Sequence, residues 1–230
     1  IRANGGNGIQ QCSGADSGGG SGGSIRLDVT SLSGSGAIQA IGGNGVPNTS
    51  DGVFSGAGGG GRIAIFYTTN TIPSTNISAR GGNVTNNGSA GTIYLRDNAQ
   101  FNGDFIIDNG GIVSSFTTPM LTALSSLRSL VLRNAATVSI SGSDFATLTI
   151  EQPVFVTSSS VFTLGAGITL IVTNPTGFDV NVENSATLSL NAGAALIVNS
   201  LRINAATLNT STPLDFPTAS DFTLSGAGVL

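Results

Sequence analysis

Three copies of one short motif occupy the first part of the chain. The copies begin at Ile1, Ile38 and Ile77, share the pattern Ile-x-Ala-x-Gly-Gly-Asn and are spaced by 37 and 39 positions. Each copy is followed by a variable segment rich in Gly, Ser and Asn, and then by a second shared stretch that starts at residue 24, 62 or 92. A repeat that cannot bury its own apolar face predicts units that stack on one another.

The second shared stretches alternate in the manner of β-strands. Ile25, Leu27 and Val29 are separated by one residue each, and so are Ile63 and Ile65. A period of two places such side chains on one face. The Gly-Gly pair of each motif predicts a sharp corner, because Gly tolerates positive φ. Segments 9–23, 46–61 and 85–91 differ in length, which predicts loops that leave the stack on one side.

The second half of the chain repeats another motif at a shorter and constant interval. Pentapeptides with Ala first and an apolar residue third begin at Ala146, Ala166, Ala186 and Ala206. A related one begins half a step earlier, at Ala136, and further apolar stretches fall between the copies at 154–156, 178–182 and 194–198. This interval predicts a coil of two or three short strands per turn, with equivalent copies in register.

Together the repeats predict an all-β chain, a parallel β-helix (solenoid) with Gly-rich loop excursions in its N-terminal half. Residues 1–118 are expected to form the Gly-rich repeats. Residues 119–230 are expected to continue them as coils of about 20 residues, a period typical of solenoids. A β-sandwich, the competing fold, also has short strands at regular spacing, but it does not normally repeat a motif three times. Segment 119–128, with apolar residues at 121, 124 and 127, is expected to be a short helix or a turn.

Charged residues are scarce, at 9% of the chain against about a quarter in an average protein. The net charge is −4, all eight basic residues are Arg, and no basic cluster exists, so nucleic acid is not expected as a partner. Apolar runs are strand-sized and far below the roughly 18 residues of a membrane span, so membrane insertion is not expected. A polar, uncharged surface favours a soluble protein outside the cell or on its surface.

Few residue types that carry catalysis are present. The chain has no His and no Lys, which excludes Ser-His-Asp and Cys-His pairs, a Lys Schiff base and Cys/His zinc sites. We therefore predict no catalytic residue, no cofactor and no metal site. Gly18, Gly20 and Gly23 match the dinucleotide pattern formally, but a strand follows them rather than a helix, so they are expected in a loop. Cys12 stands alone and is expected to be an idle thiol or an intermolecular bridge.

Paired carboxylates leave one catalytic alternative open, because glycoside cleavage uses two carboxyl groups about 5–9.5 Å apart. Asp104 with Asp108, and Asp179 with Glu183, are four residues apart, which on a strand is roughly 13 Å on one face. We expect the acids to be solvated on turns and outer faces, with calcium binding as a lesser alternative. The acids are Asp16, Asp28, Asp51, Asp97, Asp104, Asp108, Asp144, Glu151, Asp179, Glu183, Asp215 and Asp221.

Aromatic residues and glycosylation sequons are the remaining candidates for surface recognition. Phe66, Phe155, Phe162 and Phe178 fall in strand positions, so the aromatic residues are expected in core packing or in stacking between coils rather than in sugar binding. Chance accounts for most sequons in a chain this rich in Asn, Ser and Thr. The sequons are at Asn48, Asn76, Asn83, Asn87 and Asn209.

Three segments carry a family resemblance: 18–27 with its Gly-Gly-Gly-Ser-Gly-Gly-Ser run, 32–40, and 58–67 with Gly-Gly-Gly-Gly-Arg-Ile-Ala-Ile. They resemble the Gly-rich β-strand repeats of large bacterial surface proteins. The Ala-Thr-Leu-Ser-Leu coils of the second half resemble autotransporter-type adhesin passengers. The resemblance covers most of the chain and implies a right-handed parallel β-helix that is exported to the cell surface.

The function expected from these features is a non-catalytic extracellular module, structural or adhesive, of a large cell-surface or fibre protein. Its expected partners are other copies of itself, neighbouring segments of a longer surface protein, and cell-surface glycans or a host surface. A polysaccharide-acting β-helix enzyme or tail-spike-like depolymerase is one alternative, and a self-assembling extracellular filament subunit is another. The start at Ile1, within a repeat, is expected for a mature product or an excised fragment.

Overall fold

The computed structural model describes residues 1–10, 17–46, 55–120, 125–144, 146–214, 221–226 and 228–229. Within these residues the fold is all-β, with twenty strands and one short 3-10 turn, η1 (Ser74–Asn76). The chain divides into two compact units. Unit 1 contains Ile1–Phe101 and Ile106–Thr118, and unit 2 contains Asn102–Phe105 and Pro119–Leu230.

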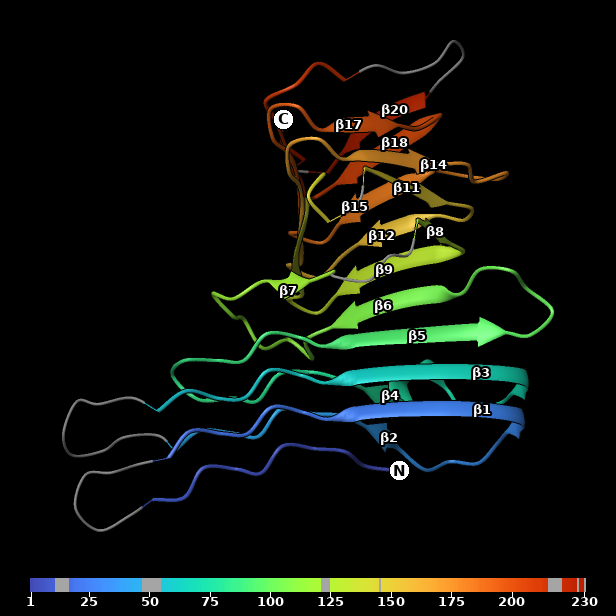
Figure 1. The fold of residues 1–230 in the computed structure, drawn as a ribbon. Coiled ribbons are helices and arrows are strands. Elements are labelled where there is room, and N and C mark those ends of the chain that lie inside the picture. Colours follow the sequence, from blue (N-terminus) through green and yellow to red (C-terminus); the bar gives the residue numbers. More distant parts are fainter. Residues whose placement is uncertain are drawn as a thin grey trace. The chain divides into compact units, whose positions relative to one another are not determined.

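Unit 1 is built on three long parallel strands, β1, β3 and β5, with two short parallel strands, β2 and β4, behind them (Figure 1). Ile25 of β1 pairs with Ile63 of β3, which pairs with Ile93 of β5. Strands β6 and β7 contain residues of both units. The bounds are β1 (Ser24–Leu32), β2 (Ile38–Gln39), β3 (Arg62–Asn70), β4 (Ile77–Ser78), β5 (Thr92–Asp97), β6 (Asp104–Asp108) and β7 (Thr118–Pro119).

The motif copies of unit 1 lie one above another, as the sequence predicts. Ile38 pairs with Ile77, and Arg2 forms a parallel bridge with Gln39. The alternation of the long strands also holds, because Ile63 and Ile65 are almost fully buried while the residues between them are more exposed. The register and the buried face of this unit are therefore confirmed.

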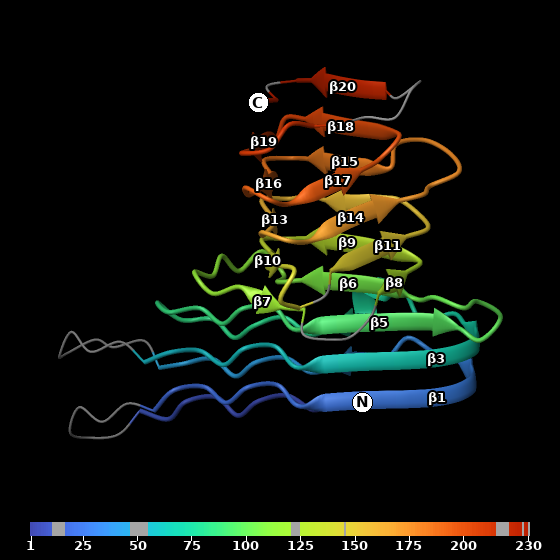
Figure 2. The ribbon, with the colours of Figure 1, turned by 45° about the horizontal axis from the view of Figure 1, so that its top comes forward.

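Glycine-rich arms extend from the strands of unit 1 (Figures 1 and 2). Each arm has an outgoing segment (residues 3–8, 40–46 or 79–84) and a returning segment (residues 17–23, 55–61 or 87–91). The arms are held by backbone hydrogen bonds in more than one direction: Gly5 N donates to Ile41 O of the next repeat at 2.8 Å, and Gly20 N donates to Gly6 O of its own arm at 2.8 Å.

The Gly-Gly pairs do not form the predicted corners. None of the glycines that the structure describes in the arms has a positive φ. The pairs are needed for close packing instead, because a Cβ on Gly5 would lie 1.9 Å from Gly20 O, and one on Gly43 would lie 2.0 Å from Gly6 O. At these positions the backbones of two segments lie so close together that the Cβ of any other residue would overlap a backbone oxygen.

Unit 2 is built from three parallel sheets that the chain visits in turn. The sheets are β9-β12-β15-β18-β20, β10-β13-β16-β19 and β8-β11-β14-β17, in spatial order. The bounds are β8 (Ser126–Leu127), β9 (Ser129–Arg133), β10 (Thr137–Ile140), β11 (Thr147–Ile150), β12 (Val154–Val156), β13 (Val161–Leu164), β14 (Thr169–Val172), β15 (Val180–Glu183), β16 (Thr187–Leu190), β17 (Ala195–Ile197), β18 (Ser200–Asn204), β19 (Thr207–Thr210) and β20 (Asp221–Ser225).

This order is consistent with a solenoid-like fold, and the parallel pairings of the described strands do not fit an antiparallel sandwich. The core consists of aliphatic and aromatic rows from neighbouring strands, such as Val138, Phe162, Leu188 and Leu208, each 0% exposed. Such rows give every strand an apolar neighbour above and below, which is the stabilisation expected of stacked units.

The constant period predicted for this half is wrong. Leu148 pairs with Leu170 on the sheet of β11 and β14, which is a longer step than the interval between the Ala-started copies. Leu188 pairs with Leu208 on the sheet of β16 and β19, where the step does equal that interval. The four copies therefore belong to two different sheets, and the step from Val161 to its partner Thr187 is longer still.

Corners formed by non-glycine residues with positive φ occur in unit 2. Pairs of residues in the left-handed region join β9 to β10, β12 to β13 and β15 to β16. The pairs are Asn134–Ala135, Ser158–Ser159 and Asn184–Ser185, with φ between 54° and 64°. These corners stack, because Ala135 N donates to Ser158 O at 2.9 Å and Ser159 N donates to Asn184 O at 3.0 Å.

The segment 119–128 is not helical where it is described. Pro119 belongs to β7, and Ser126 and Leu127 form β8, while residues 121–124 lie outside the described residues.

Candidate functional site

Asparagine side chains connect the arms of unit 1 into a ladder. The last residue of each Gly-Gly-Asn motif takes part: Asn7 Oδ1 accepts from Asn44 N, and Asn44 Oδ1 accepts from Asn83 N, both at 2.9 Å. Each amide oxygen thus satisfies a backbone N–H of the following repeat. This explains the Asn that follows Gly-Gly in the first two copies, a role that we did not predict from the sequence, while Asn83 of the third copy takes part through its backbone N–H.

Asn109 ends this arrangement at the third arm. Its Oδ1 accepts a hydrogen bond from Gly81 N at 2.9 Å. In the preceding repeat, Gly42 is equivalent to Gly81, and its N–H donates to the backbone oxygen of Arg80. The Nδ2 of Asn109 donates to Gly88 O at 3.3 Å and also to Ile112 O. Asn109 is 1% exposed. Its side-chain oxygen thus accepts, in the interior, the hydrogen bond that a backbone carbonyl of a further repeat would otherwise accept.

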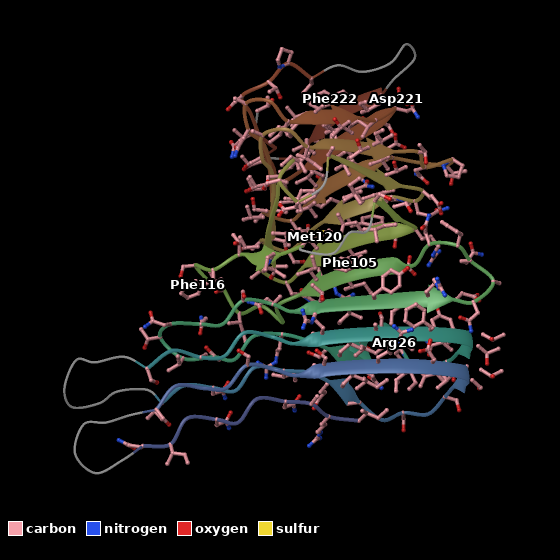
Figure 3. The ribbon with its side chains drawn as sticks, viewed as in Figure 1. Arg26, Phe105, Phe116, Met120, Asp221 and Phe222 are labelled. Atoms are coloured by element: carbon pink, nitrogen blue, oxygen red, sulfur yellow. The ribbon has the colours of Figure 1, made fainter. Side chains whose placement is uncertain are left out.

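Arginine and aromatic side chains gather on the outward face of β1, β3 and β5, the face turned away from β2 and β4 (Figure 3 labels Arg26 there). We call it the Arg–aromatic face, and it consists of Arg26, Arg62, Phe66, Tyr94 and Arg96. Strand register brings them together, since Arg26 and Tyr94 share a row with the small Ala64, and Phe66 and Arg96 share the next row with Asp28.

Phe66 is the centre of this face. The guanidinium carbons of Arg26 and Arg96, from the strands on either side, lie 4.8 and 4.7 Å from the centre of its ring. The ring of Tyr94 meets it edge-on, at 5.8 Å between centres. Arg26 is also bonded to Asp28 at 2.9 Å. Phe66 is thus stacked between repeats, as expected for aromatics, but on the outer surface.

Two cations of this face have no anionic partner among the described residues. Arg62 is exposed, and its side chain makes neither a hydrogen bond nor an ion pair there. Arg96 contacts Phe66 through its guanidinium, and its Nε is buried without a hydrogen-bond partner. The terminal N–H groups of these arginines are thus available to an anion from solution.

The carboxylate pairs singled out in the sequence have separate structural partners. Asp104 bonds Arg128 and Ser129. In the second pair, Asp179 is 1% exposed and accepts from Asn199 N, whereas Glu183 lies 3.2 Å from Arg202.

Other acids cap turns or tie neighbouring coils. Asp97 accepts from Ala99 N, Asp108 from Gly110 N and Asp144 from Ser141 N, while Glu151 accepts from Asn102. In the described part of the chain, no three acids or thiols gather as a metal site would require. Cys12, Asp16, Asp51, Asp215 and the sequon residue Asn48 lie outside the described residues.

Three of the sequon asparagines donate hydrogen bonds through their amide nitrogens, and the bond from Asn209 is to Ser189 Oγ at 3.4 Å on the exposed surface. Asn76 donates to Ser35 O and Gly36 O, and Asn87 donates to Val113 O. A glycan attached to either nitrogen would compete with these hydrogen bonds. Asn83 and Asn209 are exposed.

The residues that sequence reasoning missed are Asn109, the Asn ladder and the Arg–aromatic face. The aligned second stretches contained a signal for the face, because Arg26, Phe66 and Arg96 all stand at outward positions of strands whose order the repeats predict. Asn109 had no such signal, since its segment matches neither repeat.

No helix in the described ranges has the length and hydrophobicity to cross a membrane. No family model matches the chain, and no curated protein or solved structure is significantly similar to it.

Proposed function

We propose that the chain is a non-catalytic extracellular module, structural or adhesive, wound as a right-handed parallel β-helix. The parallel sheets that the chain visits in a fixed order support the winding. We propose right-handed winding because connections between parallel strands of one sheet are strongly biased toward the right-handed form.

The observation that carries the proposal is the superposition of repeats. Ile25, Ile63 and Ile93 lie in one ladder, and the arms of the same repeats are joined backbone to backbone. A stack of this kind is a rigid scaffold whose surface is available for contacts, and loops or arms on a rigid scaffold are where recognition usually occurs.

The carboxylates support a non-catalytic role. Asp104 and Glu183 each contact an arginine of unit 2, and Asp179 bonds a backbone N–H. A glycosidase needs one carboxyl group that protonates the leaving oxygen and a second that acts as nucleophile or base. Acids held in structural ion pairs and turns are poorly placed for both tasks.

A polysaccharide panel tests the proposal. The purified chain is incubated with neutral, amino and acidic polysaccharides, and new reducing ends are measured over time. We expect none above the level of heat-denatured protein. Reproducible turnover that is lost in Asp179→Asn or Glu183→Gln, but kept in Asp221→Asn, would replace the proposal with a polysaccharide-acting enzyme.

The extracellular location has its own test. In cells that produce the protein, we expect it to be cleaved by a protease added outside intact cells, with a cytosolic enzyme as an uncleaved marker. Protection of the protein until the cells are lysed would contradict this location.

A further inference from the structure

We infer that the Arg–aromatic face of unit 1 is a binding site for a polysaccharide that carries carboxylate groups, such as a polyuronate. The inference rests on the proposed adhesive role and names the surface and the ligand class for it. Charge, geometry and the surrounding polar groups each support it.

This face concentrates positive charge, although the net charge of the whole chain is negative. The protein has eight arginines and a net charge of −4, yet three arginines lie on the outward side of three neighbouring strands. Asp28 is the one acid at the outward positions of β1, β3 and β5, and it is bonded to Arg26. Arg62 and Arg96 therefore leave an uncompensated positive charge that attracts an anion.

Geometry holds the cations in place before a ligand arrives. The ring of Phe66 is in contact with Arg26 on one side strand and Arg96 on the other, so their guanidinium groups are partly immobilised. A guanidinium stacked on a ring keeps its N–H edge, which matches a carboxylate with two parallel hydrogen bonds. Binding then costs less side-chain ordering than it would with free arginines.

The site has a small residue at its centre and a polar, uncharged border. Ala64 lies between Arg62 and Phe66 along β3 and between Arg26 and Tyr94 across the sheet. Its short side chain leaves room above the strand. Ser, Thr and Asn residues occupy further outward positions and can bond sugar hydroxyls. Tyr94 adds an apolar ring with a hydroxyl at its tip, a combination that suits a partly hydrated ligand. The bordering residues are Ser24, Thr30, Thr68, Thr92 and Asn98.

Nucleic acid fits this face less well than a sugar acid. Backbone recognition of nucleic acid depends on many cations placed along a phosphate track, and its affinity falls steeply with salt. Here three arginines stand close together, and one of them is already paired with Asp28. A chain with occasional carboxylates and many hydroxyls matches this pattern.

Binding of the full chain to alginate, measured by calorimetry in moderate salt, tests the inference. Dextran serves as the neutral probe, and dextran sulfate and single-stranded DNA as other polyanions. We expect alginate to bind and dextran not to bind. Arg62→Gln and Arg96→Gln should each weaken alginate binding by about tenfold, the loss expected for one charge-assisted contact. Arg2→Gln removes an equal charge from another part of unit 1 and should leave binding unchanged.

Several outcomes would overturn the inference. Alginate binding that is absent, or equal in Arg62→Gln, Arg2→Gln and the unaltered chain, rules out this face as the site. Tighter binding of dextran sulfate or DNA rules out carboxylate selectivity. Circular dichroism of each variant shows whether a loss of binding reflects a loss of fold, and Arg62→Lys should restore part of the affinity.

These outcomes also separate the inference from the function on which it rests. Absence of alginate binding with no polysaccharide turnover would reject the site and leave the non-catalytic module in place. Alginate binding accompanied by release of reducing ends would keep the site and reject the non-catalytic role.

Discussion

The side-chain oxygen of Asn109 accepts a hydrogen bond of 2.9 Å from the backbone N–H of Gly81. In the preceding repeat the equivalent N–H, that of Gly42, donates to the backbone oxygen of Arg80. At the last arm, one amide side chain therefore takes the place of the backbone carbonyl that a further repeat would supply. This contact closes the glycine-rich stack without leaving a buried donor unsatisfied.

Replacing Asn109 with Leu is expected to lower the free energy of unfolding by about 2–4 kcal/mol, because several buried polar groups lose their partners. Asn109→Asp keeps an acceptor for Gly81 N but places a buried carboxyl group against the carbonyl oxygens of Gly88 and Ile112, so a loss at least as large is expected at neutral pH. Urea unfolding measures both. Asn98→Leu, at an exposed position, is the control and should change stability little. Equal effects of the 98 and 109 substitutions would show that Asn109 has no capping role.

The arms offer a matched pair of glycines. A Cβ at Gly5 would lie 1.9 Å from Gly20 O, whereas a Cβ at Gly6 would meet nothing within 4 Å. Gly5→Ala should therefore cost about 1–3 kcal/mol through overpacking against backbone. Gly6→Ala should be neutral or slightly stabilising, because it restricts the unfolded chain. Thermal unfolding of the two variants decides this, and a Gly5→Ala variant as stable as Gly6→Ala would contradict the close packing of the arms.

The left-handed corners predict a stabilising substitution. Ser185 has φ 63° and is exposed, so Ser185→Gly should relieve backbone strain and raise the free energy of unfolding by about 0.5–1 kcal/mol. The same change at Ser189, within β16, should lower stability, since Gly weakens a strand. Guanidinium unfolding of both variants is the measurement. A destabilised Ser185→Gly variant would show that the serine side chain matters more than the corner geometry.

The register of unit 2 can be tested with engineered disulfides. Thr149 pairs with Ile171 on the neighbouring strand, so cysteines at these positions should oxidise readily in a chain that also carries Cys12→Ser. Cysteines at 149 and 169 would suit the constant period of the Ala-started copies and should not pair. Mass spectrometry after oxidation distinguishes the two, and a disulfide formed only by the 149 and 169 pair would contradict the observed register.

The repeats of unit 1 were predictable because their motif copies share one pattern, even though the segments between them differ in length. The residue pairs Ile38 with Ile77 and Ile25 with Ile63 follow directly from aligned motif copies. In unit 2 the same reasoning failed at the copies starting at 146 and 166, whose strands belong to a different sheet from those of the copies starting at 186 and 206. Alternation with a period of two shows which residues of a strand face inward. It does not show to which of the sheets of a coil that strand belongs, because the strands of all the sheets have the same alternation.

The sequence by itself determined that this protein is all-β, that its repeats stack and that Ile63 and Ile65 lie on a buried face of their strand. Only the tertiary structure decided what the glycines do and where the chain turns. The absence of a Cβ permits either a positive φ or the close approach of a neighbouring group. At Gly5 and Gly43 it permits the close approach of a backbone oxygen. The partners of Phe66 were likewise decided in space, because cation–ring contacts depend on which strands lie side by side.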